Sequence, residues 1–408
     1  MLRIVSTGLL VMICGVASAV GDVVLTKKGL LKTQIRGIEE KDGRFVLRHA
    51  VGALDVREAV VVHMDRKVRT TEEGTLVRFV DGSRLYARGV TYNGVVVKMD
   101  TVFGHLEVAP DYVRMAVFLK RGLSERRVEE LTAGKKSKDY LIMATGKAVP
   151  GDLHEMGGQT VKFESTLLGG VVQVMRKDLA AVVFALLPGV GERPKPGEVR
   201  LRAHLVDGGT LRGVLKSGDG RTFLLKNAAG EFKVRLDKTE ALYFAHPDVV
   251  FLSDLDPREA KETPFFDRFL YPWQRDRTLE KKTAISIKRR LYHKGVSVHS
   301  KCELTYDLAG RYLRLITFVG LDDEARGKGD VDLSVSGDGK TLFEKKGLKG
   351  ADEPVLVNAA LEGVKELKLL VDFGRELDVL DRVAWADAFL VKKPGGEPGG
   401  DEGSGDGE

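Results

Sequence analysis

Residues 295–308 read Gly-Val-Ser-Val-His-Ser-Lys-Cys-Glu-Leu-Thr-Tyr-Asp-Leu. Apolar or small side chains occupy every second position from Val296 to Leu308, and polar side chains such as His299 and Glu303 lie between them. Because successive side chains of a strand point to opposite faces, this alternation predicts one long strand with one buried face.

The segments that follow continue this pattern. Residues 312–318 alternate in the same way and run into Val-Gly-Leu-Asp-Asp at 319–323. Further on, Leu-Lys-Leu-Leu-Val-Asp at 367–372 precedes Asp-Arg-Val-Ala-Trp-Ala-Asp-Ala at 381–388. Several strand patterns without a helical period predict a β domain over roughly residues 249–392.

The motifs of this domain resemble a known family. They are, in order, Asp276-Arg277, Lys294-Gly295 through His299-Ser300, Tyr306-Asp307-Leu308, residues 319–323, Gly337-Asp338-Gly339-Lys340 and Trp385-Ala386-Asp387-Ala388. The segment resembles the NPCM (NEW2) domain, a carbohydrate-binding module first described beside family 98 glycoside hydrolases and related to carbohydrate-binding module family 51. The resemblance implies a jelly-roll β-sandwich of the galactose-binding type, often with a structural calcium, and sugar recognition by loops at one end. Ser297, Arg382 and Ala384 depart from the family pattern near the implied site.

The chemistry of sugar binding selects candidate residues in this domain. An aromatic face shields the C–H patch of a sugar ring, and charged groups form strong hydrogen bonds with its hydroxyls. The candidate ligand-binding residues are Trp273, Arg277, His299, Asp322, Asp323, Trp385 and Asp387. Each also has a structural interpretation: Trp385 lies between alanines in an apolar strand, Asp322 and Asp323 are suited to a turn or to calcium, and His299 and Arg277 are suited to bracing neighbouring loops.

The first part of the chain contains an internal repeat. Val80-Asp81-Gly82 is followed by a glycine 22 residues later and a phenylalanine 14 residues after that, and Val206-Asp207-Gly208 is followed by the same residues at the same intervals. The two copies are offset by 126 residues. Gly170 and Phe184 repeat the second interval, and residues 52–62 resemble a shorter copy. Four units of small open barrels or sheets are expected, with Asp-Gly and Asn-Gly hairpin turns.

A helix is expected only at residues 124–133, where Ser124 can cap it and Val128 and Leu131 share a face. The repeated positions are turn residues and aliphatics, which folding requires, and the units contain no histidine, cysteine or carboxylate cluster with metal-ligand spacing. A scaffold or protein-interaction role is therefore expected for the repeats, with a second ligand-binding site as the alternative.

The N-terminus has the organisation of a secretory signal peptide. Arg3 precedes the apolar residues 9–16, and Ala17-Ser18-Ala19 offers a cleavage site. The apolar segment is shorter than the roughly 20 residues that a membrane span needs, so export to the periplasm or the extracellular space and no membrane span are expected. Cys14 would leave with this leader, and the remaining Cys302 cannot form an internal disulfide.

The charge is distributed unevenly along the chain. The whole chain carries +6, residues 394–408 contain five acids and no bases, and the leader contains one base, so residues 20–393 carry +10. The acidic, glycine-rich tail is typical of a disordered segment. In an exported protein a basic folded part favours anionic glycans or envelope polymers over nucleic acid.

The expected domains are a signal peptide at 1–19, repeats 1 and 2 at 20–120, a helical, basic connector at 121–138, repeats 3 and 4 at 139–246, the sandwich at 247–393 and the tail at 394–408. The fold class expected is all-β, with tandem small β repeats before a jelly-roll sandwich. The expected function is non-catalytic binding of a glycan or cell-envelope polysaccharide. The alternatives are a protein-interaction scaffold without sugar binding and, third, a cryptic glycoside hydrolase, which would need two carboxylates facing each other across a cleft.

Overall fold

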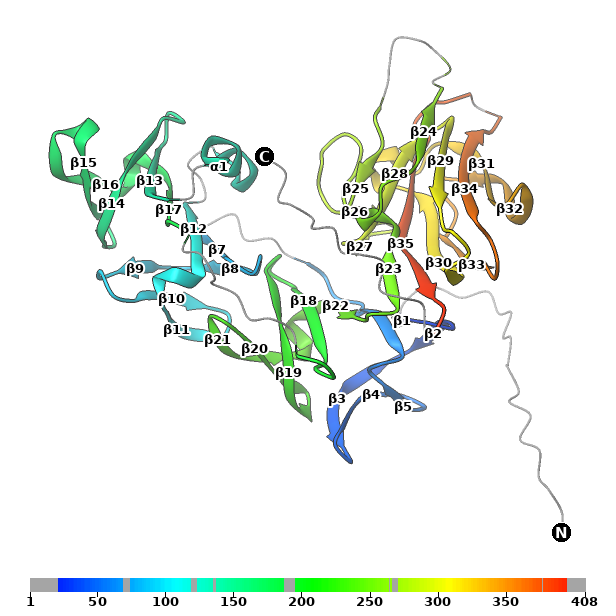
Figure 1. Ribbon diagram of the computed structural model, residues 1–408, viewed down its shortest axis with the longest axis horizontal. Helices are drawn as coiled ribbons and strands as arrows, with labels where there is room; N and C mark the ends of the chain where they lie inside the picture. Colours follow the sequence, from blue (N-terminus) through cyan, green and yellow to red (C-terminus); the bar gives the residue numbers. More distant parts are fainter. Residues whose placement is uncertain are drawn as a thin grey trace.

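The computed structural model describes residues 21–68, 74–118, 123–134, 137–186, 195–263, 265, 271–375 and 377–394. Nearly all regular elements of these residues are β-strands, with one α-helix, so the all-β fold class is confirmed. Figure 1 shows an N-terminal array of small sheets and a C-terminal sandwich, joined where strand β23 (Val249–Phe251) leaves the array.

The strands of the array fall into four consecutive groups, which we call units 1 to 4. Unit 1 comprises β1 (Asp22–Thr26), β2 (Gly29–Thr33), β3 (Ile35–Lys41), β4 (Arg44–His49), β5 (Gly52–Asp55) and β6 (Ala59–His63). Unit 2 comprises β7 (Thr75–Phe79), β8 (Arg84–Ala87), β9 (Val90–Tyr92), β10 (Val97–Thr101), β11 (Gly104–Val108) and β12 (Val113–Phe118). Unit 3 comprises β13 (Asp139–Met143), β14 (Ala148–Met156), β15 (Thr160–Ser165), β16 (Gly170–Met175) and β17 (Leu179–Val183). Unit 4 comprises β18 (Arg200–Leu205), β19 (Thr210–Gly220), β20 (Thr222–Asn227), β21 (Gly230–Arg235) and β22 (Thr239–Ala245).

The last strands of the units join them into two pairs. Strand β22 of unit 4 is antiparallel to β6 of unit 1, with Leu242 opposite Val62. Strand β12 of unit 2 is antiparallel to β17 of unit 3 in the same way, with Ala116 opposite Val182. Ala116 and Leu242 are separated by the 126-residue offset of the sequence repeat, so units 1 and 4 (pair 1–4) and units 2 and 3 (pair 2–3) have equivalent arrangements.

Helix α1 (Glu125–Thr132) lies between units 2 and 3 in the chain and packs on their joined sheet. The Ser124 side chain caps it by accepting a hydrogen bond from the Arg127 amide at 3.2 Å. Its Val128 is fully buried in a cluster with Met115 and Val117 of β12. Among the described residues no helix has the length and apolar character to cross a membrane.

A six-stranded and a five-stranded antiparallel sheet form the sandwich. The six-stranded sheet has the order β25 (Gln274–Arg275), β28 (Gly295–His299), β35 (Arg382–Lys392), β30 (Tyr312–Leu321) and β33 (Val355–Ala360), and its sixth strand, β23, pairs with β35. The five-stranded sheet has the order β24 (Glu259–Glu262), β29 (Cys302–Asp307), β34 (Glu366–Phe373), β31 (Asp330–Gly337) and β32 (Lys340–Lys349). A separate hairpin consists of β26 (Ile285–Ile287) and β27 (Arg290–Tyr292).

The prediction of a single long strand at residues 295–308 is wrong. The segment forms two strands, β28 and β29, which belong to opposite sheets of the sandwich. The chain passes from one sheet to the other at Ser300–Lys301. The alternation continues across this corner because Val296 and Val298 of β28 and Leu304 of β29 all face the same core between the sheets.

The sandwich packs against pair 1–4. Val61 and Tyr243 of the array share a buried cluster with Ile316 and Phe389 of the sandwich. This apolar contact joins the sheets of the two parts directly, so the repeats and the sandwich are not independent bodies. The sandwich covers one face of the sheet that units 1 and 4 build together.

Candidate functional site

Two of the seven candidate residues are buried in strand β35. Trp385 is fully buried in the core between the two sheets, so it does not provide a sugar-stacking surface, and the structural interpretation of its sequence context describes it correctly. Asp387 is also fully buried. Its carboxylate bonds His63 Nε2 at 2.5 Å and accepts a hydrogen bond from the Tyr243 hydroxyl at 2.8 Å, so it joins the sandwich to the array.

The acidic pair Asp322 and Asp323 fixes a turn. Asp322 accepts hydrogen bonds from the amides of Ser286 and Glu324, both at 2.9 Å. Asp323 accepts bonds from the amides of Lys288 at 3.0 Å and Arg289 at 2.9 Å. These contacts hold the β26–β27 hairpin against the end of β30, and burial raises the pKa of Asp322 to about 6.

The structural calcium that the family resemblance implies would need oxygen ligands, and Asp322 and Asp323 were the candidates for them. Calcium needs six to eight oxygen ligands, several of them carboxylates, whereas the carboxylates of Asp322 and Asp323 already accept amide hydrogens. Within the described ranges no group of three or more histidine, cysteine or acidic side chains is placed to hold a metal ion. The residues of this turn therefore do not fit a calcium site.

Trp273 and Arg277 flank the short strand β25 and have different surroundings. The Trp273 ring is half-buried against the sandwich core, its amide donates to Glu262 Oε1 at 2.7 Å, and the Arg275 guanidinium lies 5.0 Å from its centroid. Arg277 lines a cavity between the sandwich and the array. The structure therefore does not bring Trp273, Arg277 and the acidic pair together around one hollow.

The remaining candidate, His299, belongs to a group at one end of the sandwich. Its ring stacks on Tyr271 with the centroids 4.9 Å apart and an interplanar angle of 24°. The guanidinium of Arg382 lies 5.6 Å from the Tyr271 centroid, and His299 is directly opposite Arg382 in the pairing of β28 with β35. We call Tyr271, His299 and Arg382 the aromatic–basic cluster.

The cluster is held in place by its neighbours. Arg382 pairs with Glu280 at 2.8 Å and donates to the Glu324 carbonyl at 3.0 Å. His299 Nδ1 lies 2.9 Å from the Ser300 carbonyl, and burial lowers the pKa of its imidazole. A neutral imidazole, a half-exposed aromatic ring and a fixed guanidinium are groups that suit recognition of a sugar.

Sequence reasoning missed Tyr271 and Arg382 as site residues. Tyr271 lies in the same aromatic segment as Trp273. Only the observed stacking of its ring on His299 identifies Tyr271, and not Trp273, as the partner of His299. Arg382 was recognised only as a departure from the family pattern. The register that places it opposite His299 joins strands more than 80 residues apart, and no local signal in the sequence gives that register.

Comparison with known proteins supports the domain assignment. Residues 248–391 match the NPCBM/NEW2 domain model, which confirms the resemblance found in the sequence. The chain matches no curated protein.

Three solved structures from two bacteria are similar to the chain. The CBM51 module of a Clostridium perfringens GH95 protein, in complex with methyl-galactose, is 25% identical with a TM-score of 0.32, and the match covers 35% of this chain and 99% of that chain. The CBM51-2 and INT domains of Clostridium perfringens ZmpB are 21% identical with a TM-score of 0.32, covering 44% of this chain and 40% of that chain. The tandem CBM51 modules of a Streptococcus pneumoniae family 98 glycoside hydrolase are 12% identical with a TM-score of 0.32, covering 78% of this chain and 88% of that chain.

Proposed function

We propose that the protein is an exported, non-catalytic glycan-binding protein whose sandwich binds a sugar at the end that contains the aromatic–basic cluster. The observation that carries the proposal is the stacked pair of Tyr271 and His299 beside Arg382, in a domain that matches the NPCBM/NEW2 model. The Tyr271 ring offers an apolar face to the C–H side of a sugar, and Arg382 offers donors to its hydroxyls.

The carboxylates near this end support a binding role over hydrolysis. Glycoside hydrolysis needs one carboxylic acid and one carboxylate free to act on opposite sides of a bond. Here Glu280 pairs with Arg382, Glu324 accepts the amides of Glu280 and Lys281, and Asp381 accepts the Ser300 hydroxyl at 2.6 Å. Each of these side chains serves to hold a loop.

The test is binding of the full chain, without its leader, to an array of neutral and acidic glycans, followed by titration of the best ligand. Tyr271→Ala and Arg382→Gln should each weaken binding about 5- to 30-fold, because each removes a contact of about 1 to 2 kcal/mol. Arg314→Gln is the matched control, since Arg314 is exposed on the same sheet and contacts Asn358. Retention of full affinity by both cluster variants would refute the proposed site, and absence of binding to every glycan would favour the scaffold function.

A further inference from the structure

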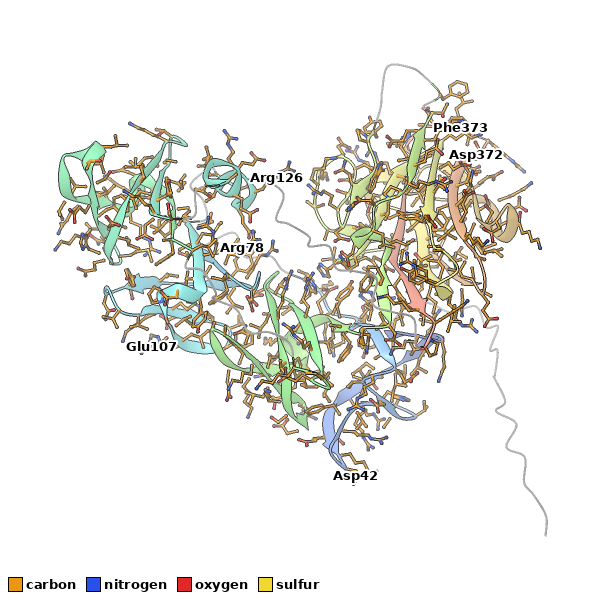
Figure 2. All side chains as sticks on the ribbon, in the orientation of Figure 1. Asp42, Arg78, Glu107, Arg126, Asp372 and Phe373 are labelled. Carbon is orange, nitrogen blue, oxygen red and sulfur yellow. The ribbon has the colours of Figure 1, made fainter. Side chains whose placement is uncertain are left out.

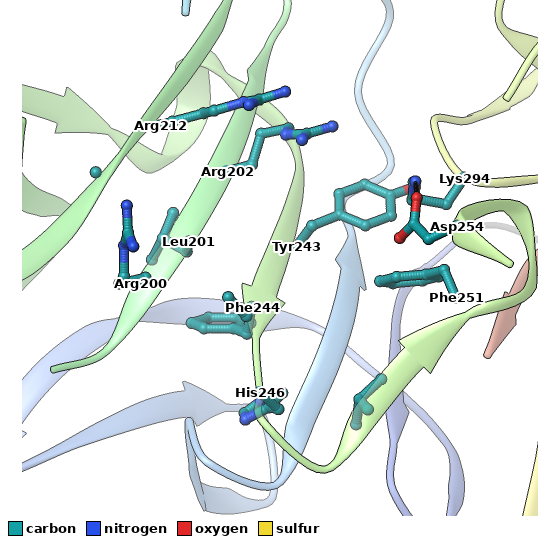
Figure 3. A pocket seen from close by; sticks show the side chains of 13 residues that line it. Arg200, Leu201, Arg202, Arg212, Tyr243, Phe244, His246, Phe251, Asp254 and Lys294 are labelled. Carbon is teal, nitrogen blue, oxygen red and sulfur yellow. Dashed lines mark hydrogen bonds and ion pairs between the residues drawn. The ribbon is translucent and has the colours of Figure 1, made fainter. Parts of the chain in front are cut away.

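A second site lies between the array and the sandwich, where two adjoining cavities share Arg202 and Arg212. One cavity of about 350 Å³ lies between unit 4 and the start of the sandwich. The other, of about 930 Å³, continues toward helix α1. We call the joined cavities the interdomain trough. Figure 3 shows the first cavity, with Arg200, Arg202 and Arg212 on the array side and Phe251, Asp254 and Lys294 on the sandwich side.

The cations of the trough outnumber the carboxylates that could neutralise them. Among the described residues, five cationic side chains lining it make no ion pair: Arg200, Arg202, Arg212, Arg277 and Lys282. Within the same part of the chain, the Arg212 guanidinium donates only to the carbonyl of Asp81, at 3.1 Å. Neighbouring cationic side chains repel one another, and this repulsion lowers the stability of the folded protein unless an anion binds between them.

The acids that line the same cavities already have cationic partners. Asp254 and Asp276 share one cation, Lys294, the latter at 2.9 Å, and both also attract Arg202 at longer range. Glu240 bonds His293 at 2.8 Å. On the far wall, Glu125 and Glu129 of α1 pair with Arg78 of β7, which Figure 2 shows on the side of the array that faces the sandwich, together with Arg126.

Partial desolvation makes the unpaired guanidiniums strong anion ligands. Burial lowers the pKa of Arg202, and burial followed by repulsion from Arg202 lowers the pKa of Arg212 to about 10. Both remain charged at neutral pH, and the Coulomb attraction for an incoming anion is larger in a half-buried cleft than in water. Guanidinium groups also bind carboxylate and sulfate oxygens in a two-pronged geometry.

The smaller cavity adds an apolar surface to this charge. Val249 and the half-buried Phe251 line it from the sandwich. Its volume lies in the range of about 300 to 1,000 Å³ that is usual for small-ligand pockets. An aromatic ring opposite guanidiniums suits a sugar ring that carries an acidic group. A row of stacking aromatics, which binding of single-stranded nucleic acid would need, does not line the described part of the trough.

We propose that the interdomain trough binds a segment of an acidic polysaccharide, with its carboxylate or sulfate groups on Arg200, Arg202 and Arg212 and a sugar ring against Phe251. None of these residues belongs to the aromatic–basic cluster, so the trough is a second site with its own ligand class. A polymer bound there would contact the array and the sandwich together.

The experiment is calorimetric titration of the full chain, without its leader, with four probes: a galacturonic acid hexasaccharide, a heparin hexasaccharide, a neutral glucose hexasaccharide and a single-stranded DNA dodecamer. Binding of either acidic oligosaccharide, weakened by added NaCl, supports the proposal, and the two acidic probes distinguish carboxylate from sulfate recognition. Failure of both acidic probes to bind would overturn the proposal, as would DNA binding at least as tightly as they do, or the neutral hexasaccharide doing so in the Tyr271→Ala variant, which lacks the sugar contact at the sandwich end.

Matched variants locate the site. The double variant R202Q/R212Q should bind the acidic oligosaccharide about tenfold or more weakly, because two charge-assisted hydrogen-bond donors are lost. The control R36Q/R44Q removes two exposed arginines of unit 1 and should bind unchanged. Equal losses in both double variants would show that net charge alone acts, which refutes the site.

Two further measurements distinguish binding in the trough from a structural role of Arg202 and from binding at the sandwich end. Arg202→Gln alone should change the melting temperature little, because no hydrogen bond or ion pair of Arg202 is found among the described residues, and the attraction of Asp276 and Asp254 for Arg202 is offset by burial and by repulsion from Arg84. A large fall in its melting temperature would assign Arg202 a structural role and contradict the proposal. Tyr271→Ala should leave acidic-oligosaccharide binding unchanged, so failure of the sugar site at the sandwich end and failure of the trough are distinguishable.

Discussion

Pair 1–4 and pair 2–3 place the same sheet face against two different covers. In pair 2–3 the face formed by β12 and β17 packs on helix α1, through Met115, Val117 and Val183. In pair 1–4 the equivalent face packs on the sandwich, through Ala241 and Tyr243. Each pair thus has one apolar face that another element must bury. The sandwich, which follows unit 4, covers this face in pair 1–4, and helix α1, which lies between units 2 and 3, covers it in pair 2–3.

The chemistry of the two covered faces differs. Val117 and Val183 of pair 2–3 correspond to Tyr243 and His63 of pair 1–4, by their equivalent places in the strand pairings. Tyr243 and His63 both bind the buried Asp387 of the sandwich. An apolar face suffices for a helix of eight residues, whereas the sandwich is held in one orientation by a buried polar contact, which specifies geometry more than it adds stability.

The largest expected effect is on this polar contact. Asp387→Ala leaves the Tyr243 hydroxyl and the His63 Nε2 without their partner in a fully buried position, which should cost about 2 to 5 kcal/mol. Both tryptophans of the chain, Trp273 and Trp385, lie in the sandwich, so tryptophan fluorescence during urea unfolding reports on that domain. The midpoint should fall clearly below that of the wild type.

A variant that copies pair 2–3 provides the control. The triple variant H63V/Y243V/D387A replaces His63 and Tyr243 with the valines of the equivalent positions, and it should recover part of the stability lost in Asp387→Ala, because the imidazole and the hydroxyl that lack their carboxylate partner are removed. The recovery is only partial because the His293 amide loses the Tyr243 hydroxyl that accepts its hydrogen bond. An Asp387→Ala protein as stable as the wild type would show that the sandwich does not depend on this contact.

The second expected effect concerns the helix cover. Val128 is fully buried between α1 and the sheet of pair 2–3, so Val128→Ala removes apolar contacts and leaves a cavity at a cost of about 1 to 3 kcal/mol. Far-UV circular dichroism should show earlier unfolding of pair 2–3, whereas the tryptophan signal of the sandwich, which packs on pair 1–4, should keep its midpoint. Arg126→Ala, on the exposed face of the same helix, should change neither signal by more than about 0.5 kcal/mol.

Local patterns in the sequence predicted much of this fold. The alternation at 312–318 and 367–372 lies within β30 and β34, and the capped helix expected at 124–133 is α1. The 126-residue offset, found from the Val-Asp-Gly motifs, also separates Ala116 and Leu242 of the equivalent strand pairings. These features depend on residues close in the chain or on copies of one pattern, so they leave a readable signal.

Features that depend on distant strands left no such signal. Alternation was the same on both sides of Ser300, so it could not show that β28 and β29 belong to opposite sheets. Asp387 lies two residues after the buried Trp385, so strand alternation places both side chains on the face that points into the core. In the structure Asp387 adopts a positive φ of 47° at a bulge where the register of β30 and β35 shifts. The bulge turns Asp387 out of the core toward the array, and only the strand pairing reveals it.

The smallest expected effect is the contribution of His204, on the covered face of pair 1–4, to the pH dependence of stability. His204 is buried there and stacks on His293 with the ring centroids 3.5 Å apart. Its pKa lies well below the usual value because of burial first and then electrostatic repulsion between protonated His204 and its neighbours His293, Arg202, Arg84 and His63. The Arg78 at the equivalent position of pair 2–3 instead pairs with acids of α1.

The sign of the effect follows from proton binding. Below about pH 6.5 the unfolded chain binds a proton on His204 that the folded chain does not, so the free energy of unfolding falls as the pH decreases. The wild type should therefore lose about 1 kcal/mol relative to His204→Asn between about pH 7 and pH 5.5. Asp322 and Asp381, whose pKa values burial raises to about 6, act in the opposite direction in this range, but they are present in both proteins and cancel in the difference.

The measurement is urea unfolding of both proteins across this pH range. A constant difference between the wild type and His204→Asn would mean that His204 takes up its proton equally in the folded and unfolded chains. In that case burial would not disfavour the charged form of His204, and this part of the contrast with the helix-covered face of pair 2–3 would fail.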